Sequence, residues 1–298
     1  GRVMVIAEDP IFPAPGLPLE IFGWFTVHIG ASDVAVTGVK PEFMTYSLLL
    51  PPEFPEREAK VIIDSIGDAA KELDICIAGG HTGWYPAVTV PTVGGVTVWG
   101  YAPSDKWVSP GGAREGDTLL MTKGPAIEAA ALLAVIYREK ISGKLKTELL
   151  ETACDRTGQI TVVKDALTAF ASGGVHAMHD ATEGGVLGGL WEMSASSGLP
   201  LHADLDAVPV PEDITAVSRA LDFDPWAAIS EGTLLLAVSP DSEKKVMQSL
   251  NQAGIDCWKL GSFLQEGKLS GIRRSGRELK LVEPEADPFW ELFFKGIE

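Results

Sequence analysis

Residues 180–185, with the sequence Asp-Ala-Thr-Glu-Gly-Gly, carry the strongest chemical signal in the chain. They follow a short apolar run and precede an apolar helical pattern, which predicts a strand-to-helix turn. Asp180 and Thr182 can accept hydrogen bonds from free N–H groups there. Gly184 and Gly185 would let an anion approach the helix N-terminus closely. The pattern indicates a phosphate or carboxylate site, and a simple capping turn is the alternative.

A second strand-to-helix turn places a cation next to a glycine. Thr122, Lys123 and Gly124 end an apolar strand pattern, and Pro125 follows them. A lysine ammonium at such a turn could bind a phosphate group. A Gly-Pro pair is also an ordinary helix start, and on the local pattern alone that interpretation is favoured.

A third glycine-rich segment contains Gly80, His81 and Thr82 and is expected directly after a strand at 75–78. Its imidazole and hydroxyl could contact a phosphate, with His81 as a ligand or proton carrier. A structural histidine is the alternative. His176 and His179 are expected on a strand, where their spacing directs them to opposite faces, so no joint metal site is expected.

Two aspartates are expected beside apolar elements. Asp9 follows a strand predicted at 3–7, and Asp33 lies where small residues are predicted to interrupt a helix at 19–38. Carboxylates in apolar surroundings are costly unless they are paired or bind a metal. If the two meet, they would suit Mg²⁺ that carries a nucleotide phosphate. A turn acid and a capping acid are the alternatives.

Composition limits the class of protein. The chain has 298 residues, which predicts two domains, and 41 acidic against 24 basic residues, a net charge of −17 that argues against a nucleic-acid binder. Neither G-x-x-x-x-G-K-[ST] nor G-x-G-x-x-G occurs.

The three widely spaced cysteines favour a reducing, cytoplasmic location. No apolar run approaches the ~20 residues of a membrane span. The first residues have no signal-peptide pattern. They have the pattern of the middle of a strand, so further natural residues are expected before them.

The elements that must position these residues follow an α/β pattern with a domain boundary near residue 108. In the first half, strands are expected at 3–7, 44–50, 75–78 and 87–101, with helices at 19–38 and 55–73. In the second half, strands are expected at 117–122, 175–178, 234–238 and 256–264, with a hairpin turn at 275–276. The helices of that half are expected at 125–136, 145–157, 159–171, 186–197, 214–221, 241–253 and 287–294, with Asp241 as a cap.

Taken in order, six segments resemble the PurM-like superfamily, which includes aminoimidazole ribonucleotide (AIR) synthetase, the hydrogenase maturation factor HypE, selenophosphate synthetase and thiamine-monophosphate kinase. The chain is most similar to its AIR synthase-related, HypE-like proteins. The segments span nearly the whole sequence: AEDP at 7–10, GASDVAVTG at 30–38, GGHT at 79–82, GDTLLMTKG at 116–124, HDATEGG at 179–185 and SEGTLL at 230–235.

The resemblance implies a PurM-like two-domain α/β fold. Residues 1–108 would form the ATP-binding, dimerising domain, whose strands join those of a second subunit in a β-barrel, and residues 109–298 would form an α/β sandwich facing it across a cleft. ATP and Mg²⁺ would bind there, with Asp9 and Asp33 serving the metal and phosphates and the glycines at 184–185 holding an anionic group. Catalysis would rest on positioning and charge neutralisation.

Three departures from the superfamily pattern affect the expected substrate. His81 stands where members usually have an acid, and Mg²⁺ prefers oxygen ligands. Glu183 stands where HypE has an arginine, which reverses the charge offered to a substrate. Residues 293–298 lack the terminal cysteine that carries the modified group in HypE. The expected substrate is therefore not that of HypE.

The leading hypothesis is a homodimeric, Mg²⁺-requiring enzyme that uses ATP to phosphorylate and activate an amide- or carbonyl-type oxygen of a small substrate. One alternative is a non-catalytic nucleotide-binding protein of the same fold, which acts in maturation or regulation with a partner protein. The other alternative is a small-molecule kinase that resembles thiamine-monophosphate kinase. No nucleic-acid or membrane partner is expected.

Overall fold

The computed structural model describes residues 1–296. The chain forms two compact units, Gly1–Trp107 and Val108–Glu298. Ile297 and Glu298, which belong to the C-terminal sequence discussed above, lie outside the described residues. Within the described part of the chain, no helix is long and apolar enough to cross a membrane.

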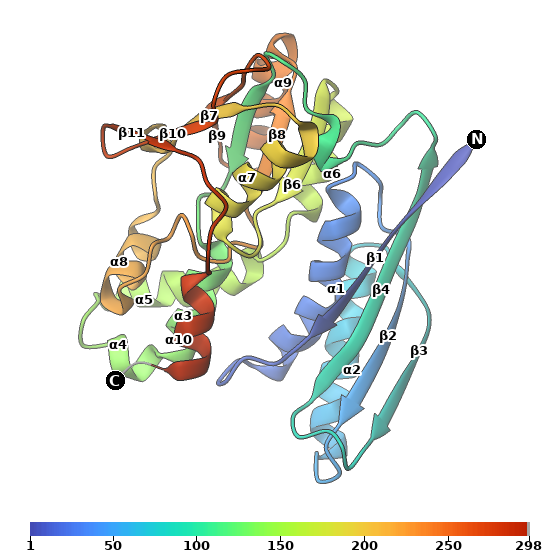
Figure 1. Ribbon diagram of the computed structural model, residues 1–298. Helices are drawn as coiled ribbons and strands as arrows, with labels where there is room; N and C mark the ends of the chain where they lie inside the picture. The colour runs from blue at the N-terminus through green and yellow to red at the C-terminus, as the bar shows by residue number, and fades with distance from the viewer. Residues whose placement is uncertain (297–298) are drawn as a thin grey trace. The chain divides into compact units, whose positions relative to one another are not determined.

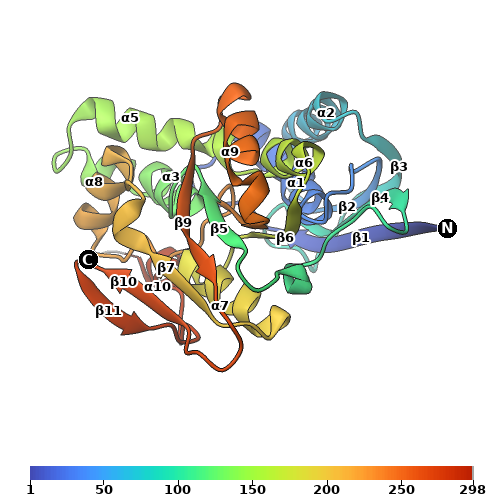
Figure 2. The ribbon, with the colours of Figure 1, turned by 90° about the horizontal axis from the view of Figure 1, so that it is seen from above.

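The first unit is a four-stranded sheet with two helices on one face (Figures 1 and 2). Its elements are β1 (Arg2–Ile11), α1 (Leu19–Ala35), β2 (Phe43–Leu50), α2 (Glu56–Glu72), β3 (Cys76–Trp84) and β4 (Thr92–Pro103). The strand order is β1-β4-β2-β3, and only β2 and β3 are parallel. In the single chain this sheet is open, with β1 and β3 at its edges, so the barrel that the resemblance implies would need a second subunit.

Helix α1 differs from the prediction because it is continuous. The small residues around Gly30 were expected to interrupt it, but they lie inside the helix. A Cβ atom at Gly30 would come within 2.9 Å of Val98 Cγ2 on β4, so the glycine allows helix and sheet to approach closely. Asp33 is therefore a helical residue, and its interpretation as a cap at a helix break is wrong.

Both edge strands continue beyond their predicted ends. Strand β1 was expected to end at residue 7, but it includes Asp9, which pairs with Val96 of β4, and it ends only at Ile11. Strand β3 includes 79–82, so this segment is not a turn after a strand. Edge strands tolerate proline and glycine because one side of the backbone is unpaired. The proline and glycine residues that predict turns in the sequence therefore lie inside strands β1 and β3.

The second unit contains a seven-stranded sheet in the order β11-β10-β7-β9-β5-β8-β6. Its strands are β5 (Thr118–Thr122), β6 (Val175–Asp180), β7 (Leu201–Asp204), β8 (Leu234–Val238), β9 (Cys257–Phe263), β10 (Gly271–Arg274) and β11 (Arg277–Lys280). Its α-helices are α3 (Ile127–Ile136), α4 (Arg138–Ile141), α5 (Thr147–Asp155), α6 (Val163–Ser172), α7 (Gly185–Ser197), α8 (Glu212–Leu221), α9 (Glu243–Gln252) and α10 (Pro288–Lys295).

The central strands of this sheet are buried on both faces. Every residue of β5 and β8 is buried, which matches their continuous apolar sequences. One face packs on α7 through a core that includes Leu119, Leu190 and Leu235. The four-residue elements β7 and α4 were not predicted, since such short segments show little periodicity. Asp241 lies in a 3₁₀ turn, Pro240–Ser242, rather than at the cap of α9.

Candidate functional site

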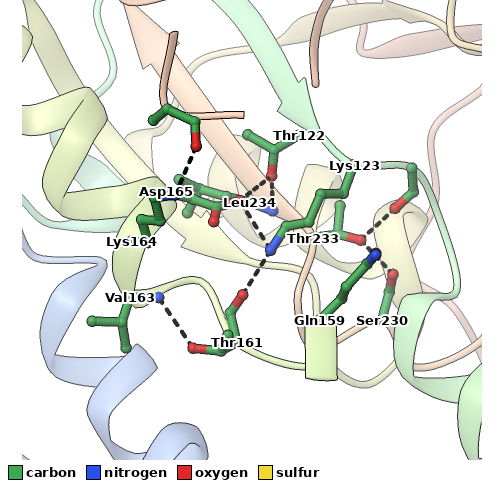
Figure 3. Close-up of polar contacts among 12 residues, drawn as sticks. Thr122, Lys123, Gln159, Thr161, Val163, Lys164, Asp165, Ser230, Thr233 and Leu234 are labelled. Atoms are coloured by element: carbon green, nitrogen blue, oxygen red, sulfur yellow. Dashed lines mark hydrogen bonds and ion pairs between the residues drawn. The ribbon is translucent and has the colours of Figure 1, made fainter. Parts of the chain in front are cut away.

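Three of the predicted motifs, at 116–124, 179–185 and 230–235, meet where strands β5 and β6 end and strand β8 begins. Strand β8 runs antiparallel between β5 and β6, so its start lies beside the ends of both neighbours. The Thr233 hydroxyl donates to the carbonyl of Gly124. The carbonyl of Thr233 accepts from Ala181 N–H at 2.9 Å, and Leu234 N–H donates to Thr122 Oγ1 at 3.1 Å. Figure 3 shows the Thr122 side of this network.

The Lys123 ammonium takes part in an ion pair with the buried Asp165, and the lysine side chain itself is 14% exposed. Its Nζ atom lies 3.1 Å from Asp165 Oδ2 and donates to the Thr161 carbonyl at 2.7 Å (Figure 3). Thr122 Oγ1 donates to the same Asp165 oxygen at 2.9 Å. Lys123 also adopts a left-handed backbone conformation, φ +57°, which is uncommon outside glycine. In this arrangement the lysine stabilises the turn, and its contact with a phosphate remains a prediction.

A carboxylate of the chain itself occupies the predicted anion position before α7. Gly184 N–H donates to Asp287 Oδ2 at 2.8 Å, and Gly185 N–H donates to the Thr182 carbonyl at 2.9 Å. Asp287 also accepts the N–H of Phe289, as the cap of α10, and that of Ile229. Gly184 N–H is therefore bonded to a carboxylate of the chain itself, and the binding of a ligand anion at this turn stays a prediction.

Gly185 also has a packing role. Its φ is +59°, and a Cβ atom there would lie 2.5 Å from the carbonyl oxygen of Ala228. Gly184 has φ +75°, and a Cβ on it would lie 3.2 Å from Pro284 Cγ. The two glycines thus permit both the turn and the close approach of neighbouring backbone.

Several carboxylates gather around this turn. Glu128, in the first turn of α3, is buried and accepts a hydrogen bond from Glu231 N–H at 3.2 Å. Burial raises the pKa of Glu128 to about 8, against the lowering effect of that hydrogen bond. The negative charges of Asp287, Glu183 and Asp180 raise it further. Glu128 therefore holds a proton at neutral pH.

The two histidines of β6 have different partners. His176 Nδ1 lies 2.9 Å from Asp117 Oδ1, whereas His179 Nε2 lies 2.8 Å from Glu192 Oε2. Burial alone would lower the pKa of His179, but the hydrogen bond with Glu192 and the charge of Asp180 raise it overall. His179 thus interacts with two acidic residues near the 180–185 turn, Glu192 and Asp180.

In the first unit, Asp9 and Asp33 lie beside the same stretch of α1. A Cβ atom at Gly30 would lie 3.7 Å from Asp9 Oδ2, so this carboxylate lies next to α1 at Gly30. Asp33 follows three residues later and thus lies on the same helix face. Across residues 1–296, no three His, Cys, Asp or Glu side chains are placed to hold a metal. Two carboxylates fit Mg²⁺ that completes its shell with phosphate and water rather than a protein cage.

His81 lies on the exposed edge strand β3, with Gly80 and Thr82 on either side. Its Nε2 atom is 2.5 Å from the Tyr85 hydroxyl. Gly80 has φ +155°, and a Cβ there would lie 2.5 Å from the Tyr46 carbonyl oxygen, so the glycine is required by strand pairing. The candidate residues therefore form two groups, with 9, 33 and 80–82 in the first unit and 122–124 and 180–185 in the second.

Sequence reasoning missed three acidic residues of the second group. Glu128 and Asp165 are buried acidic residues within apolar helices, and each is visible in the sequence as an acid among apolar neighbours. Asp287 precedes Pro288, a common helix-start pattern, but its bond to Gly184 spans 103 residues of sequence. No local pattern could have indicated that bond.

The two units and the order of their motifs define a two-domain α/β protein of PurM-like architecture. Residues 1–102 match the N-terminal domain of AIR synthase related proteins, and residues 114–274 match the C-terminal domain. The chain therefore belongs to the AIR synthase related protein family, which confirms the resemblance inferred from the six motifs.

Curated and solved relatives agree with this assignment. The chain is 26% identical to carbamoyl dehydratase HypE of Cupriavidus necator over 278 residues, 90% of this chain and 75% of that protein. A structure of the hydrogenase maturation protein HypE in complex with ATP has a TM-score of 0.78 at 21% identity, covering 97% and 87% of the two chains. Thiamine monophosphate kinase from Aquifex aeolicus has a TM-score of 0.73 at 16% identity, covering 94% and 90%. At these identities the solved structures show a shared fold.

Proposed function

We propose that this protein is an ATP-dependent, Mg²⁺-requiring enzyme that phosphorylates an amide- or carbonyl-type oxygen of a small substrate and thereby makes that oxygen a leaving group. The observation that carries this proposal is the position of Asp9 beside Gly30 of α1, about one helical turn before Asp33, in a chain that matches both domains of its family. Phosphoryl transfer needs positioning and charge neutralisation rather than a covalent nucleophile.

Asp9 and Asp33 would hold the Mg²⁺ that carries the nucleotide phosphates. When bound, Mg²⁺ supplies positive charge that neutralises the transferring phosphoryl group. His81, exposed on β3 and hydrogen-bonded to Tyr85, is placed to exchange a proton with solvent or with a bound group. We propose it as the proton carrier, in place of the acid usual in the superfamily.

Isothermal titration with ATP and Mg²⁺ tests the nucleotide site. We expect saturable Mg²⁺-dependent binding of ATP. Asp9→Asn and Asp33→Asn should each weaken this binding by at least tenfold, because each replaces a negatively charged ligand of Mg²⁺ with a neutral amide. Asp105→Asn is the matched control, because Asp105 is exposed in the same unit. Absence of binding at millimolar nucleotide would refute the proposal. Release of ADP with a panel of amides and carbonyl compounds would then identify the acceptor.

The first unit also supports the proposed homodimer. The sheet face opposite α1 and α2 carries exposed apolar side chains, including Met4, Ile6 and Tyr101. Both edge strands, β1 and β3, present unpaired backbone groups on one side. Such a surface is typical of an interface. Sedimentation analysis should give a dimer, and Ile6→Lys should shift it to monomer; a wild-type monomer at all concentrations would refute this assembly.

A specific observation favours a second candidate, a nucleotide-binding maturation or regulatory protein without turnover. The phosphate donors predicted in the second unit, Gly184 N–H and the Lys123 ammonium, both bond within the chain. Binding of ATP without release of ADP across the substrate panel would favour this candidate, including a role with a partner protein. A kinase of the thiamine-monophosphate kinase type would instead leave phosphate on its product.

A further inference from the structure

A cavity of about 230 Å³ lies in the second unit, between the start of α7 and the segment that leads into α10. Two indoles and four carboxylates contribute to its wall: Trp191, Trp290, Glu183, Glu192, Glu283 and Asp287. Among the described residues that line it, none is lysine or arginine. The cavity therefore combines flat aromatic walls with negative charge on several sides.

Both indoles are held in place by packing. Trp290 stacks on Phe294 with ring centroids 5.6 Å apart and contacts the edge of Phe289 at 5.1 Å. Trp191 comes from α7 and packs against the core of the unit. The two indoles thus reach the cavity from different elements, Trp191 from α7 and Trp290 from α10. A cation over an indole face is attracted by the ring quadrupole.

The charge around the cavity is only partly balanced by the protein. His179 lies 2.8 Å from Glu192, and Asp287 accepts three backbone N–H groups. Burial nevertheless raises the pKa of Asp287, and the nearby charge of Glu183 raises it further. A phosphate or carboxylate ligand would meet four carboxylates here, whereas a cation would stabilise all of them.

We infer that this cavity binds a positively charged organic group of the substrate: an ammonium, a guanidinium or an aromatic cation. Its volume is below the usual range for a whole drug-sized ligand, which suits one cationic group rather than a complete substrate. The inference rests on the proposed function only in assigning this group to the phosphoryl acceptor. It also gives Glu183 a role, because the charge at this position would select a cationic acceptor.

Calorimetric titration without nucleotide tests the cavity directly. The probes are tetramethylammonium and agmatine, with tert-butanol as the neutral control of similar shape and acetate as the anionic control. We expect at least one cation to bind saturably with a Kd below about 10 mM, and neither control to bind. No saturable binding of either cation, or equal binding of tert-butanol, would overturn the inference.

Three variants locate the binding. Glu183→Gln, at an exposed position, should weaken cation binding by about threefold to tenfold, because one carboxylate charge is lost. Trp290→Leu should weaken it by about fivefold through loss of the ring face. Glu285→Gln removes an exposed acid of the same segment that does not line the cavity, and should leave affinity unchanged. Equal affinities in all three variants would overturn the inference.

The two proposals fail separately. If Mg²⁺-ATP does not bind but the cation does, the proposed function is wrong and the cavity assignment stands. If Mg²⁺-ATP binds and no cation does, the cavity assignment is wrong while the nucleotide site stands. Glu183→Gln remains informative even if Trp290→Leu disturbs α10, because residue 183 is solvent-exposed.

Discussion

Glu128 gives the sharpest prediction on stability, because its proton is bound more tightly in the folded chain than in the unfolded chain. Its pKa is about 8 in the folded state and 4.5 in an unperturbed carboxyl. Between these values the unfolded state has released the proton and the folded state still holds it. Folding stability therefore falls as pH rises through this window. Between pH 5 and pH 8, the titration of Glu128 alone should lower the free energy of unfolding by roughly 3 kcal/mol.

Glu128→Gln removes this dependence while keeping an oxygen that can accept from Glu231 N–H. At pH 5 the variant should be more stable than the wild type by only about 1 kcal/mol, because glutamine resembles the protonated acid and the unfolded wild type has lost part of its proton. At pH 8 it should be more stable by roughly 4 kcal/mol. Urea unfolding at fixed pH values, followed by tryptophan fluorescence, measures the difference. Glu115→Gln is the control, because Glu115 is exposed to solvent in the same unit.

A specific result would refute this reasoning. If the stabilities of wild type and Glu128→Gln remain parallel from pH 5 to pH 8, Glu128 does not bind its proton more tightly on folding. The carboxyl would then have access to water or to a cation. A difference that grows toward low pH would also contradict the prediction, since it would place the folded pKa below the unfolded one.

The remaining predictions concern packing and ion pairing. Gly30→Ala should destabilise the first unit by about 1–3 kcal/mol, because its Cβ would press on Val98 Cγ2 at 2.9 Å. Gly67→Ala, in α2 with no atom within 4 Å of the added Cβ, should instead stabilise by about 0.5–1 kcal/mol; thermal unfolding compares the two. Asp165→Ala should cost about 3–5 kcal/mol by leaving the Lys123 ammonium buried without its carboxylate, and adding Lys123→Met should recover part of that loss.

Much of the fold was predictable because each element has a clear local period. The buried strands β5 and β8 are continuous apolar runs, and α2 alternates apolar and charged residues with the helical repeat. The ends of β1 and β3 were not predictable, since pairing with the neighbouring strand overrode the local glycine and proline signals. The same limit applies to α1, where Gly30 serves packing rather than a break.

The candidate site was predictable as a set of motifs but not as a set of contacts. The Gly-Gly pattern at 184–185 predicts a site for a ligand anion, whereas in the structure Gly184 N–H donates to the Asp287 carboxylate of the same chain. That the carboxylate is Asp287 depends on a contact between residues far apart in sequence, which no local rule encodes. The pairing of Lys123 with Asp165, across 42 residues of sequence (165 − 123), was hidden for the same reason.

The position of Asp287 has a consequence for folding during synthesis. The sheet of the first unit is complete once residue 103 is available, because β1 pairs with β4, so this unit can fold while the ribosome still translates the second. The turn at 184–185 must wait for residue 287 before its Gly184 N–H finds this partner. Until then, the start of α7 would be exposed on an incomplete unit. A nascent chain stalled before residue 287 should therefore be protease-resistant in its first unit and sensitive near α7.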